Sequence, residues 1–213
     1  EISTRDWSSD VCSSDLDLLS GGLGSDTADY AYLSTGLTAT LNSFGTVTLV
    51  AASGDTDTLV SIENIRGGDG NDILVGDSAN NALRGNAGND LLDGGLGSDA
   101  ADYGYLATGL TATLNSTGTV TLVAATGDTD TLVSIENLFG GSGNDTLVGD
   151  SGDNLLRGSS GVDLLDGQLG NDIADYAYLG TALTVTLNGA GTVTLVAATG
   201  DTDTLVSIEN VRG

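Results

Sequence analysis

The chain has 213 residues, of which 30 are acidic and only five basic, so its formal net charge is −25. This charge excludes nucleic acid and anionic membrane surfaces as natural partners, because their phosphates would repel the chain, and it favours a metal cation. No apolar run approaches the roughly 20 residues that span a bilayer, and no secretory signal peptide is visible.

The first 16 residues differ from everything that follows. They read EISTRDWSSDVCSSDL and contain the single Trp (Trp7) and the single Cys (Cys12) of the chain. This stretch resembles the conceptual translation of a sequencing adapter, and similarity to the later repeats begins abruptly at Asp17. We therefore expect residues 1–16 to be a non-native segment, a hypothesis that recovery of the same codons from the native locus would overturn.

From Asp17 onward the chain repeats with a period of 73 residues, and one recurring motif begins at Ser25, Ser98 and Asn171. Each unit consists of four nonapeptides followed by a spacer of 37 residues. Both ends are expected to be cuts through a longer array. In chain order we predict a truncated nonapeptide block at 17–29, a spacer at 30–66, a block at 67–102, a spacer at 103–139, a block at 140–175 and a spacer at 176–213.

The spacers predict β-strands. In LTATLN (residues 37–42) and GTVTLV (residues 45–50), apolar residues alternate with polar ones, which is typical of strands with one buried face. The following DTLVSIENI (residues 57–65) breaks strict alternation and predicts a strand that bends or bulges. No helix is predicted anywhere.

The nonapeptides follow the pattern G-G-x-G-x-D-x-U-x, where U is a large apolar residue. Glycines at positions 1, 2 and 4 allow a tight turn whose carbonyl groups converge, and the Asp at position 6 adds a carboxylate. Ca²⁺ takes about six to eight oxygen ligands, which two stacked turns can supply together. The apolar residues at position 8 should fill a thin core between two small sheets; they are Leu74, Leu83, Leu92, Ala101, Leu147, Leu156, Leu165 and Ala174.

If two nonapeptides make one turn of a coil, equivalent turns recur every 18 residues. The predicted pairs are Asp72 with Asp90, Asp145 with Asp163, Asn81 with Asp99, and Asn154 with Asp172. Pairs that contain Asn should bind more weakly, because Asn keeps an oxygen but lacks the charge. The full set of predicted calcium ligands comprises Asp26, Gly67, Gly68, Gly70, Asp72, Asn81, Gly88, Asp90, Gly94, Gly95, Gly97, Asp99, Gly140, Gly141, Gly143, Asp145, Asn154, Gly161, Asp163, Gly170 and Asp172.

These nonapeptides resemble the hemolysin-type calcium-binding repeat of the RTX family. The resemblance implies an all-β fold, a parallel β-roll or β-solenoid with calcium-binding turns, and export through a type I secretion system to an extracellular or cell-surface location. It also implies folding on contact with extracellular calcium. Stacked carboxylates repel one another without a cation, so the binding energy of calcium becomes folding energy.

Two functions are compatible with these patterns. The chain is predicted to be a calcium-binding structural region of a large adhesin-like protein, whose surface or host ligands the sequence does not name. The alternative is an export and folding module of a secreted hydrolase. We expect no enzymatic activity in this chain, because without His or Lys a Ser or Thr nucleophile has no obvious base.

Several spacer residues leave alternatives open. For Thr38, Thr40, Thr46 and Thr48, strand propensity is favoured over a flat ice-binding array. The Asp pairs such as Asp55 and Asp57 favour a solvated turn over a further cation site. The glutamates Glu63, Glu136 and Glu209 favour hydrogen bonding over metal ligation. Packing over the end of the roll is favoured over sugar stacking for Tyr30, Tyr32, Tyr103, Tyr105, Tyr176 and Tyr178.

Overall fold

The structure is a computed structural model, and it describes residues 18–42, 47–51, 56–115, 120–124, 127–180, 183–187, 192–197 and 202–213. The segment predicted to be non-native, residues 1–16, lies outside these described residues. In the described ranges the chain forms strands and turns but no helix, and hence no helix that could cross a membrane. The chain divides into two compact units, Glu1–Asp99 and Ala100–Gly213.

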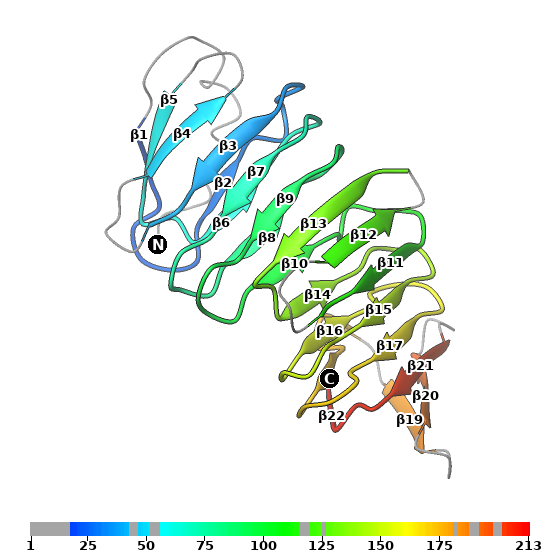
Figure 1. The fold of residues 1–213 in the computed structure, drawn as a ribbon. Helices are drawn as coiled ribbons and strands as arrows, with labels where there is room; N and C mark the ends of the chain where they lie inside the picture. Colours follow the sequence, from blue (N-terminus) through cyan, green and yellow to red (C-terminus); the bar gives the residue numbers. More distant parts are fainter. Residues whose placement is uncertain are drawn as a thin grey trace. The chain divides into compact units, whose positions relative to one another are not determined.

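In the first unit the strands form a long sheet in the order β1-β5-β4-β3-β7-β9 and a short sheet in the order β2-β6-β8 (Figure 1). The strands are β1 (Leu18–Ser20), β2 (Thr27–Asp29), β3 (Leu37–Thr40), β4 (Val47–Ala51), β5 (Thr56–Val60), β6 (Asn64–Arg66), β7 (Ile73–Val75), β8 (Ala82–Arg84) and β9 (Leu91–Asp93).

The second unit repeats this arrangement, with a long sheet in the order β13-β12-β11-β15-β17-β21-β20-β19 and a short sheet in the order β10-β14-β16-β18-β22. Its strands are β10 (Ala100–Asp102), β11 (Leu110–Thr113), β12 (Val120–Ala124), β13 (Thr129–Val133), β14 (Asn137–Phe139), β15 (Thr146–Val148), β16 (Leu155–Arg157), β17 (Leu164–Asp166), β18 (Ile173–Asp175), β19 (Leu183–Leu187), β20 (Thr192–Ala197), β21 (Thr202–Val206) and β22 (Asn210–Arg212).

The nonapeptides form a parallel coil that advances 18 residues per turn. Ile73 in β7 pairs with Leu91 in β9, and Leu155 in β16 pairs with Ile173 in β18. Each nonapeptide contributes one three-residue strand, and the strands alternate between the two sheets. The predicted all-β coil of two nonapeptides per turn is therefore confirmed.

The middle residue of every nonapeptide strand points into the core between the sheets. The predicted core positions, from Leu74 to Ala174, are all fully buried. Burying a Leu side chain contributes about 1.5–3 kcal/mol relative to leaving it in water. Three-residue strands can therefore hold a coil together only because every turn adds another such residue.

Each spacer interrupts the long sheet with an antiparallel strand. In the first unit β3 pairs in parallel with β7, β4 pairs antiparallel with both β3 and β5, and β5 pairs in parallel with β1. The short sheet gains only β6 from the same spacer, in parallel register with β2 and β8. The two sheets that enclose the core are therefore unequal, because the spacer adds three strands to one sheet and one to the other.

The predicted alternation in the first spacer strand is confirmed, since Leu37, Ala39 and Leu41 are buried while Thr38 and Thr40 are exposed. The predicted bend also occurs: β5 ends at Val60, Ser61 has a positive φ of 51°, and the chain then enters β6 in the other sheet. This change of sheet explains the broken alternation. Thr46 and the side chain of Thr48 lie outside the described residues, so the disfavoured ice-binding alternative is not tested.

In the short sheet of each unit, arginines occupy the ends of strands. Each arginine of the described chain is the last residue of its strand, and these are Arg66, Arg84, Arg157 and Arg212. The Arg66 guanidinium lies 3.2 Å from the Asp29 carboxylate, and the fully buried Asp175 contacts both Arg157 and Arg212. Arg66, Arg157 and Arg212 thus form ion pairs with aspartates on neighbouring strands.

Candidate calcium-binding turns

The predicted ligands lie in the turns that connect the two sheets. We call the turns at 67–72, 85–90, 140–145 and 158–163 long-sheet turns, because a long-sheet strand follows each of them. The turns at 21–26, 76–81, 94–99, 149–154 and 167–172 are called short-sheet turns. Asp26, Gly94, Gly95, Gly97, Asp99, Asn81, Asn154, Gly170 and Asp172 lie in short-sheet turns, and Gly67, Gly68, Gly70, Asp72, Gly88, Asp90, Gly140, Gly141, Gly143, Asp145, Gly161 and Asp163 lie in long-sheet turns.

Glycine is needed where successive turns touch. Gly161 has a φ of 131°, a conformation that residues with a side chain rarely adopt. A side-chain carbon at this position would also overlap the carbonyl oxygen of Gly143, one coil turn earlier. The turns can therefore stack at strand spacing only because this position has no side chain.

In the long-sheet turns of each unit, the position-6 carboxylates form a buried stack. The backbone N–H of Asp72 donates to Asp90 Oδ1 at 2.8 Å, and the N–H of Asp145 donates to Asp163 Oδ1 at 2.8 Å. All four side chains are at most 2% exposed. The structure thus brings together the two pairs that the 18-residue coil predicts, while their role as calcium ligands stays a prediction.

The short-sheet turns form a second column that contains the predicted Asn positions. The N–H of Asn81 donates to Asp99 Oδ1 at 2.7 Å, and the N–H of Asn154 donates to Asp172 Oδ1 at 2.8 Å. The Asn81 amide is engaged at both ends, because Oδ1 accepts from Asp77 N–H and Nδ2 donates to the Glu63 carbonyl. These contacts are consistent with the weaker binding expected at Asn.

The turns occur in two conformations that differ in what the position-2 amide contacts. In the closed form this amide donates to the position-6 side chain, as from Gly68 to Asp72 Oδ2 at 2.9 Å. In the open form the position-2 residue has a positive φ, and in the turn at 167–172 its amide donates instead to Asp166 Oδ1 at 3.1 Å. The open form occurs at Gly22, Asn86, Gly95, Ser159 and Gln168, whose φ values lie between 68° and 94°.

Oxygen atoms converge beside the first glycine of each turn. A carbon added to Gly67 would overlap Asp72 Oδ2 and lie 2.8 Å from the Gly85 carbonyl oxygen, and Gly140 has the equivalent neighbours Asp145 Oδ2 and the Gly158 carbonyl. Oxygen donors from carboxylates and carbonyls are the ligands that Ca²⁺ prefers. In the described part of the chain no three acidic side chains gather into a metal site, so backbone carbonyls would have to complete the coordination.

Burial makes these carboxylates costly to ionise. Desolvation raises the pKa of Asp145 to about 6, against the lowering effect of hydrogen bonds from Leu110 and Gly141, and the nearby Asp203 carboxylate raises it further. Desolvation also raises the pKa of Asp172, with Glu209 among the charges that add to the effect. A bound cation would remove this penalty.

Each spacer supplies a buried carboxylate, and the solvated turn predicted for these aspartates is wrong. We expected Asp57 to lie in a solvated turn, but Asp57, Asp130 and Asp203 lie within strands and are only 3% exposed. Their partners are buried tyrosines: the hydroxyls of Tyr30, Tyr103 and Tyr176 donate to Asp57, Asp130 and Asp203 at 3.2, 2.9 and 2.7 Å. The two-residue alternation offered a signal, since Asp57 shares the face of the buried Leu59.

For several tyrosines and glutamates of the spacers, the predicted roles are confirmed. Tyr30, Tyr103 and Tyr176 are each 1% exposed, which confirms packing for these three rather than sugar stacking. Hydrogen bonding is confirmed for two glutamates, because Glu63 Oε2 accepts from Asp26 N–H and Glu209 Oε2 accepts from Asp172 N–H. Asp26 therefore stacks on a spacer residue and not on another nonapeptide.

Comparisons with known proteins identify the nonapeptide blocks. Residues 66–100 and 139–174 match the family described as RTX calcium-binding nonapeptide repeat (4 copies), and no curated protein gives a significant match. Among solved structures, the chain is similar to the extracellular lipase LipA from Serratia marcescens, at 18% identity over 68% of this chain and 37% of the lipase chain, with a TM-score of 0.18. The two matched blocks are RTX nonapeptide repeats, which are motifs of a calcium-binding type.

Proposed function

We propose that the chain is a calcium-binding structural repeat region of a large secreted, adhesin-like protein, and that it folds on exposure to extracellular calcium. The observation that carries this proposal is the column of buried carboxylates, such as Asp145 and Asp163, stacked beside converging carbonyl oxygens. Several ionised groups so close together destabilise the folded chain unless a cation neutralises them.

The residues that would hold calcium differ in what they supply. Asp72 and Asp90, with their equivalents Asp145 and Asp163, supply carboxylates, while the glycines supply carbonyl oxygens and let the turns approach one another. Calcium, when bound, would bridge successive turns and neutralise their charge. The apolar core then closes over each added turn, so ion binding and core formation are coupled.

The same coupling is compatible with export. At low calcium the carboxylates repel one another and leave the chain unfolded, the state in which we propose it passes through a type I exporter. The near-identity of the 73-residue units favours a long structural array, because repeats of this kind extend a protein and stack by nearest-neighbour contacts. Reading the full coding sequence distinguishes this from a folding module attached to a secreted hydrolase.

A calcium titration followed by circular dichroism tests the proposal. We expect a coil spectrum in chelator, a β spectrum at millimolar calcium, and no such change at equal magnesium, because Mg²⁺ demands a smaller and more rigid octahedron. Asp90→Ala should raise the calcium midpoint, whereas Asp69→Ala should not, because Asp69 is an exposed side chain in a neighbouring long-sheet turn. A circular dichroism spectrum that does not change with calcium would refute the proposal.

A further inference from the structure

The spacer turns Ser61–Glu63 and Ser207–Glu209 take the place of a nonapeptide turn in the short-sheet column. Asp172 N–H donates to Glu209 Oε2 at 2.8 Å, just as Asn154 N–H donates to Asp172 Oδ1 at 2.8 Å one turn earlier. In the first unit Asp26 N–H donates to Glu63 Oε2 at 2.9 Å. The Ser-Ile-Glu turn is shorter than a nonapeptide turn, and the longer Glu side chain makes up the difference in reach.

The serine of each turn presents its carbonyl group as a glycine would. Ser61 and Ser207 have positive φ values of 51° and 48°, which is uncommon for residues with a side chain. A carbon added to Gly167 would overlap both Asp172 Oδ2 and the Ser207 carbonyl oxygen. The first glycine of the nonapeptide turn thus faces the same pair of oxygens, a carboxylate and a carbonyl, that is found beside Gly67.

One of these carboxylate oxygens has no hydrogen-bond donor. Asp172 is fully buried, and within the described part of the chain its Oδ2 atom accepts no hydrogen bond. In the first unit, the buried Oδ2 atom of Asp26 likewise accepts no hydrogen bond from the described residues. By contrast, both oxygens of Asp203 in the long-sheet column accept donors, from Asp163 N–H and from the Tyr176 hydroxyl. A buried charged oxygen without a donor is costly, and a cation would satisfy it.

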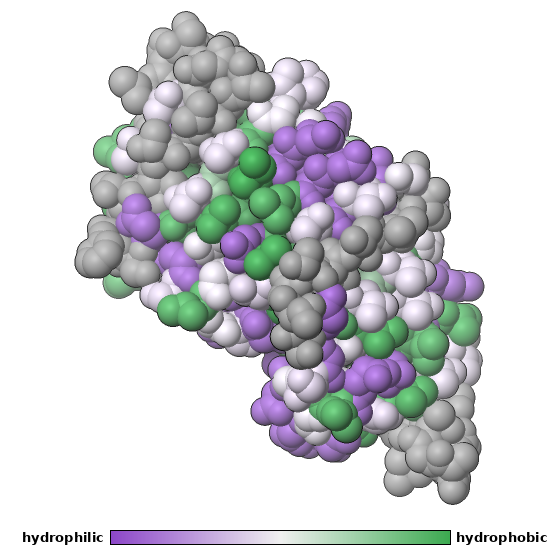
Figure 2. All heavy atoms as spheres, viewed as in Figure 1, coloured by the Kyte–Doolittle hydropathy of each residue, from purple (hydrophilic) through white to green (hydrophobic). Residues whose placement is uncertain are grey.

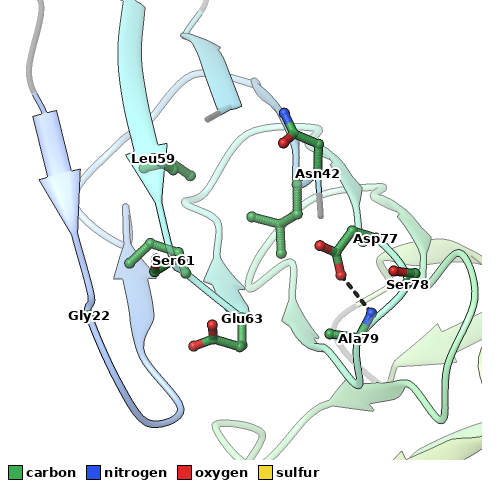
Figure 3. A pocket seen from close by; sticks show the side chains of 10 residues that line it. Gly22, Asn42, Leu59, Ser61, Glu63, Asp77, Ser78 and Ala79 are labelled. Atoms are coloured by element: carbon green, nitrogen blue, oxygen red, sulfur yellow. Dashed lines mark hydrogen bonds between the residues drawn. The ribbon is translucent and has the colours of Figure 1, made fainter. Parts of the chain in front are cut away.

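In the first unit a cavity of about 340 Å³ opens beside the Ser61–Glu63 turn, with Gly22, Ser61, Glu63 and Asp77 among its lining residues. Figure 3 shows the Glu63 carboxylate directed toward the turn that carries Gly22, with Asp77 on the opposite side of the cavity. The opening gives water access, and water molecules commonly complete the coordination of calcium.

We propose that each of these Ser-Ile-Glu turns completes a further calcium site with the nonapeptide turn stacked against it. One site uses the carboxylates of Asp172 and Glu209 and the carbonyl of Ser207, and the other uses Asp26, Glu63 and Ser61. This inference rests on the proposed calcium binding of the nonapeptides and extends it to the spacer. The spacer is then a ligand-bearing part of the array and carries the calcium column across the junction.

The test compares the calcium stoichiometry of the whole chain with that of Glu63→Gln/Glu209→Gln, by native mass spectrometry and isothermal titration calorimetry. Gln keeps the oxygen that accepts the Asp amide but removes the charge, so we expect affinity at these two sites to fall about tenfold or more. At calcium that just saturates the wild-type chain, the variant should bind two fewer ions. The control Asp69→Asn also removes a charge, from an exposed side chain in a long-sheet turn and outside both proposed spacer sites, and should bind the wild-type number.

The outcomes separate the two proposals. If the wild-type chain binds no calcium, the proposed function itself fails. If it binds calcium and the glutamine variant binds as many ions with unchanged affinity, the nonapeptides bind the metal and the spacer site is refuted. If the glutamine variant does not fold, crystals of the wild-type chain with terbium in place of calcium decide: an anomalous peak between Asp172 and Ser207 supports the site, and peaks confined to nonapeptide pairs overturn it.

Discussion

Replacing Tyr176 by Phe isolates the buried Tyr–Asp pair of the spacer. The Tyr176 hydroxyl donates to Asp203 Oδ2 at 2.7 Å, with the tyrosine 1% and the aspartate 3% exposed. Burial, followed by the charge of Asp203, raises the pKa of Tyr176 far above its ordinary value, so the hydroxyl remains a donor at any working pH. The substitution keeps the ring and removes only this donor.

The size of the effect follows from the chemistry of the pair. A hydrogen bond to a charged group contributes about 1.5–3 kcal/mol, and a buried acceptor left without its donor costs toward the upper end of that range. We therefore expect Tyr176→Phe to lower the free energy of unfolding by about 2–3 kcal/mol.

Urea unfolding at saturating calcium, followed by circular dichroism, measures this loss. The matched control is Tyr178→Phe, since the Tyr178 ring is 39% exposed and its hydroxyl donates to the Ser159 carbonyl at the surface; it should cost less than about 1 kcal/mol. In a double-mutant cycle, Asp203→Asn should cost less in the Tyr176→Phe background than in the wild-type chain. Equal losses for the two tyrosine variants would refute the reasoning.

Two further predictions concern pH and packing. The folded-state pKa of Asp145 is raised to about 6 from 3.8, so between these values the folded chain binds more protons than the unfolded chain, and stability falls as pH rises through 6. In chelator, acidification from pH 7 to 4 should therefore stabilise the chain, by about 2.5 kcal/mol from this group, and circular dichroism should show β structure increasing. Asp145→Asn should reduce this pH dependence, and a loss of β structure on acidification would contradict the prediction. Gly161→Ala should destabilise the calcium-bound chain in urea unfolding, by about 1–3 kcal/mol, because Ala must adopt a positive φ and would overlap the Gly143 carbonyl. Gly180→Ala is its control, because an added carbon there meets no neighbour, and equal unfolding midpoints for the two variants would count against the stacking argument.

The coil itself could be predicted from the sequence because its determinants are local and repeated. The nine-residue spacing of Leu74, Leu83 and Leu92 predicts strands that alternate between two sheets, and the structure buries all three. The same spacing brings Asp72 beside Asp90.

The structure of the spacer was harder to predict from the sequence, because its strands and side chains contact residues that are distant in the chain. The pairing of β3 with β7, and the antiparallel β4 between β3 and β5, depend on sheet contacts that no local pattern states. The Tyr–Asp pairs join residues 27 positions apart. The prediction of a solvated turn at Asp57 was therefore wrong, because the hydrogen-bond donor to Asp57 lies in a distant part of the chain. The open and closed turns also escaped prediction, because Gln168 adopts a positive φ without being glycine.

The surface on view in Figure 2 carries apolar side chains in small groups separated by polar ones. Leu96 and Leu169, at position 3 of their nonapeptides, are each more than 70% exposed. Isolated exposed leucines are normal on soluble surfaces, and we assign them no partner.

The unequal contribution of the spacer to the two sheets has a consequence for how such an array changes length. In the short sheet, β2, β6 and β8 stay in uninterrupted parallel register, although 37 residues separate the first pair and 18 the second. The antiparallel detour is confined to the other sheet, where its first and last strands pair in parallel with their neighbours. A whole 73-residue unit can therefore be gained or lost by recombination between near-identical copies, and the strands on either side of the junction meet the same partners as before.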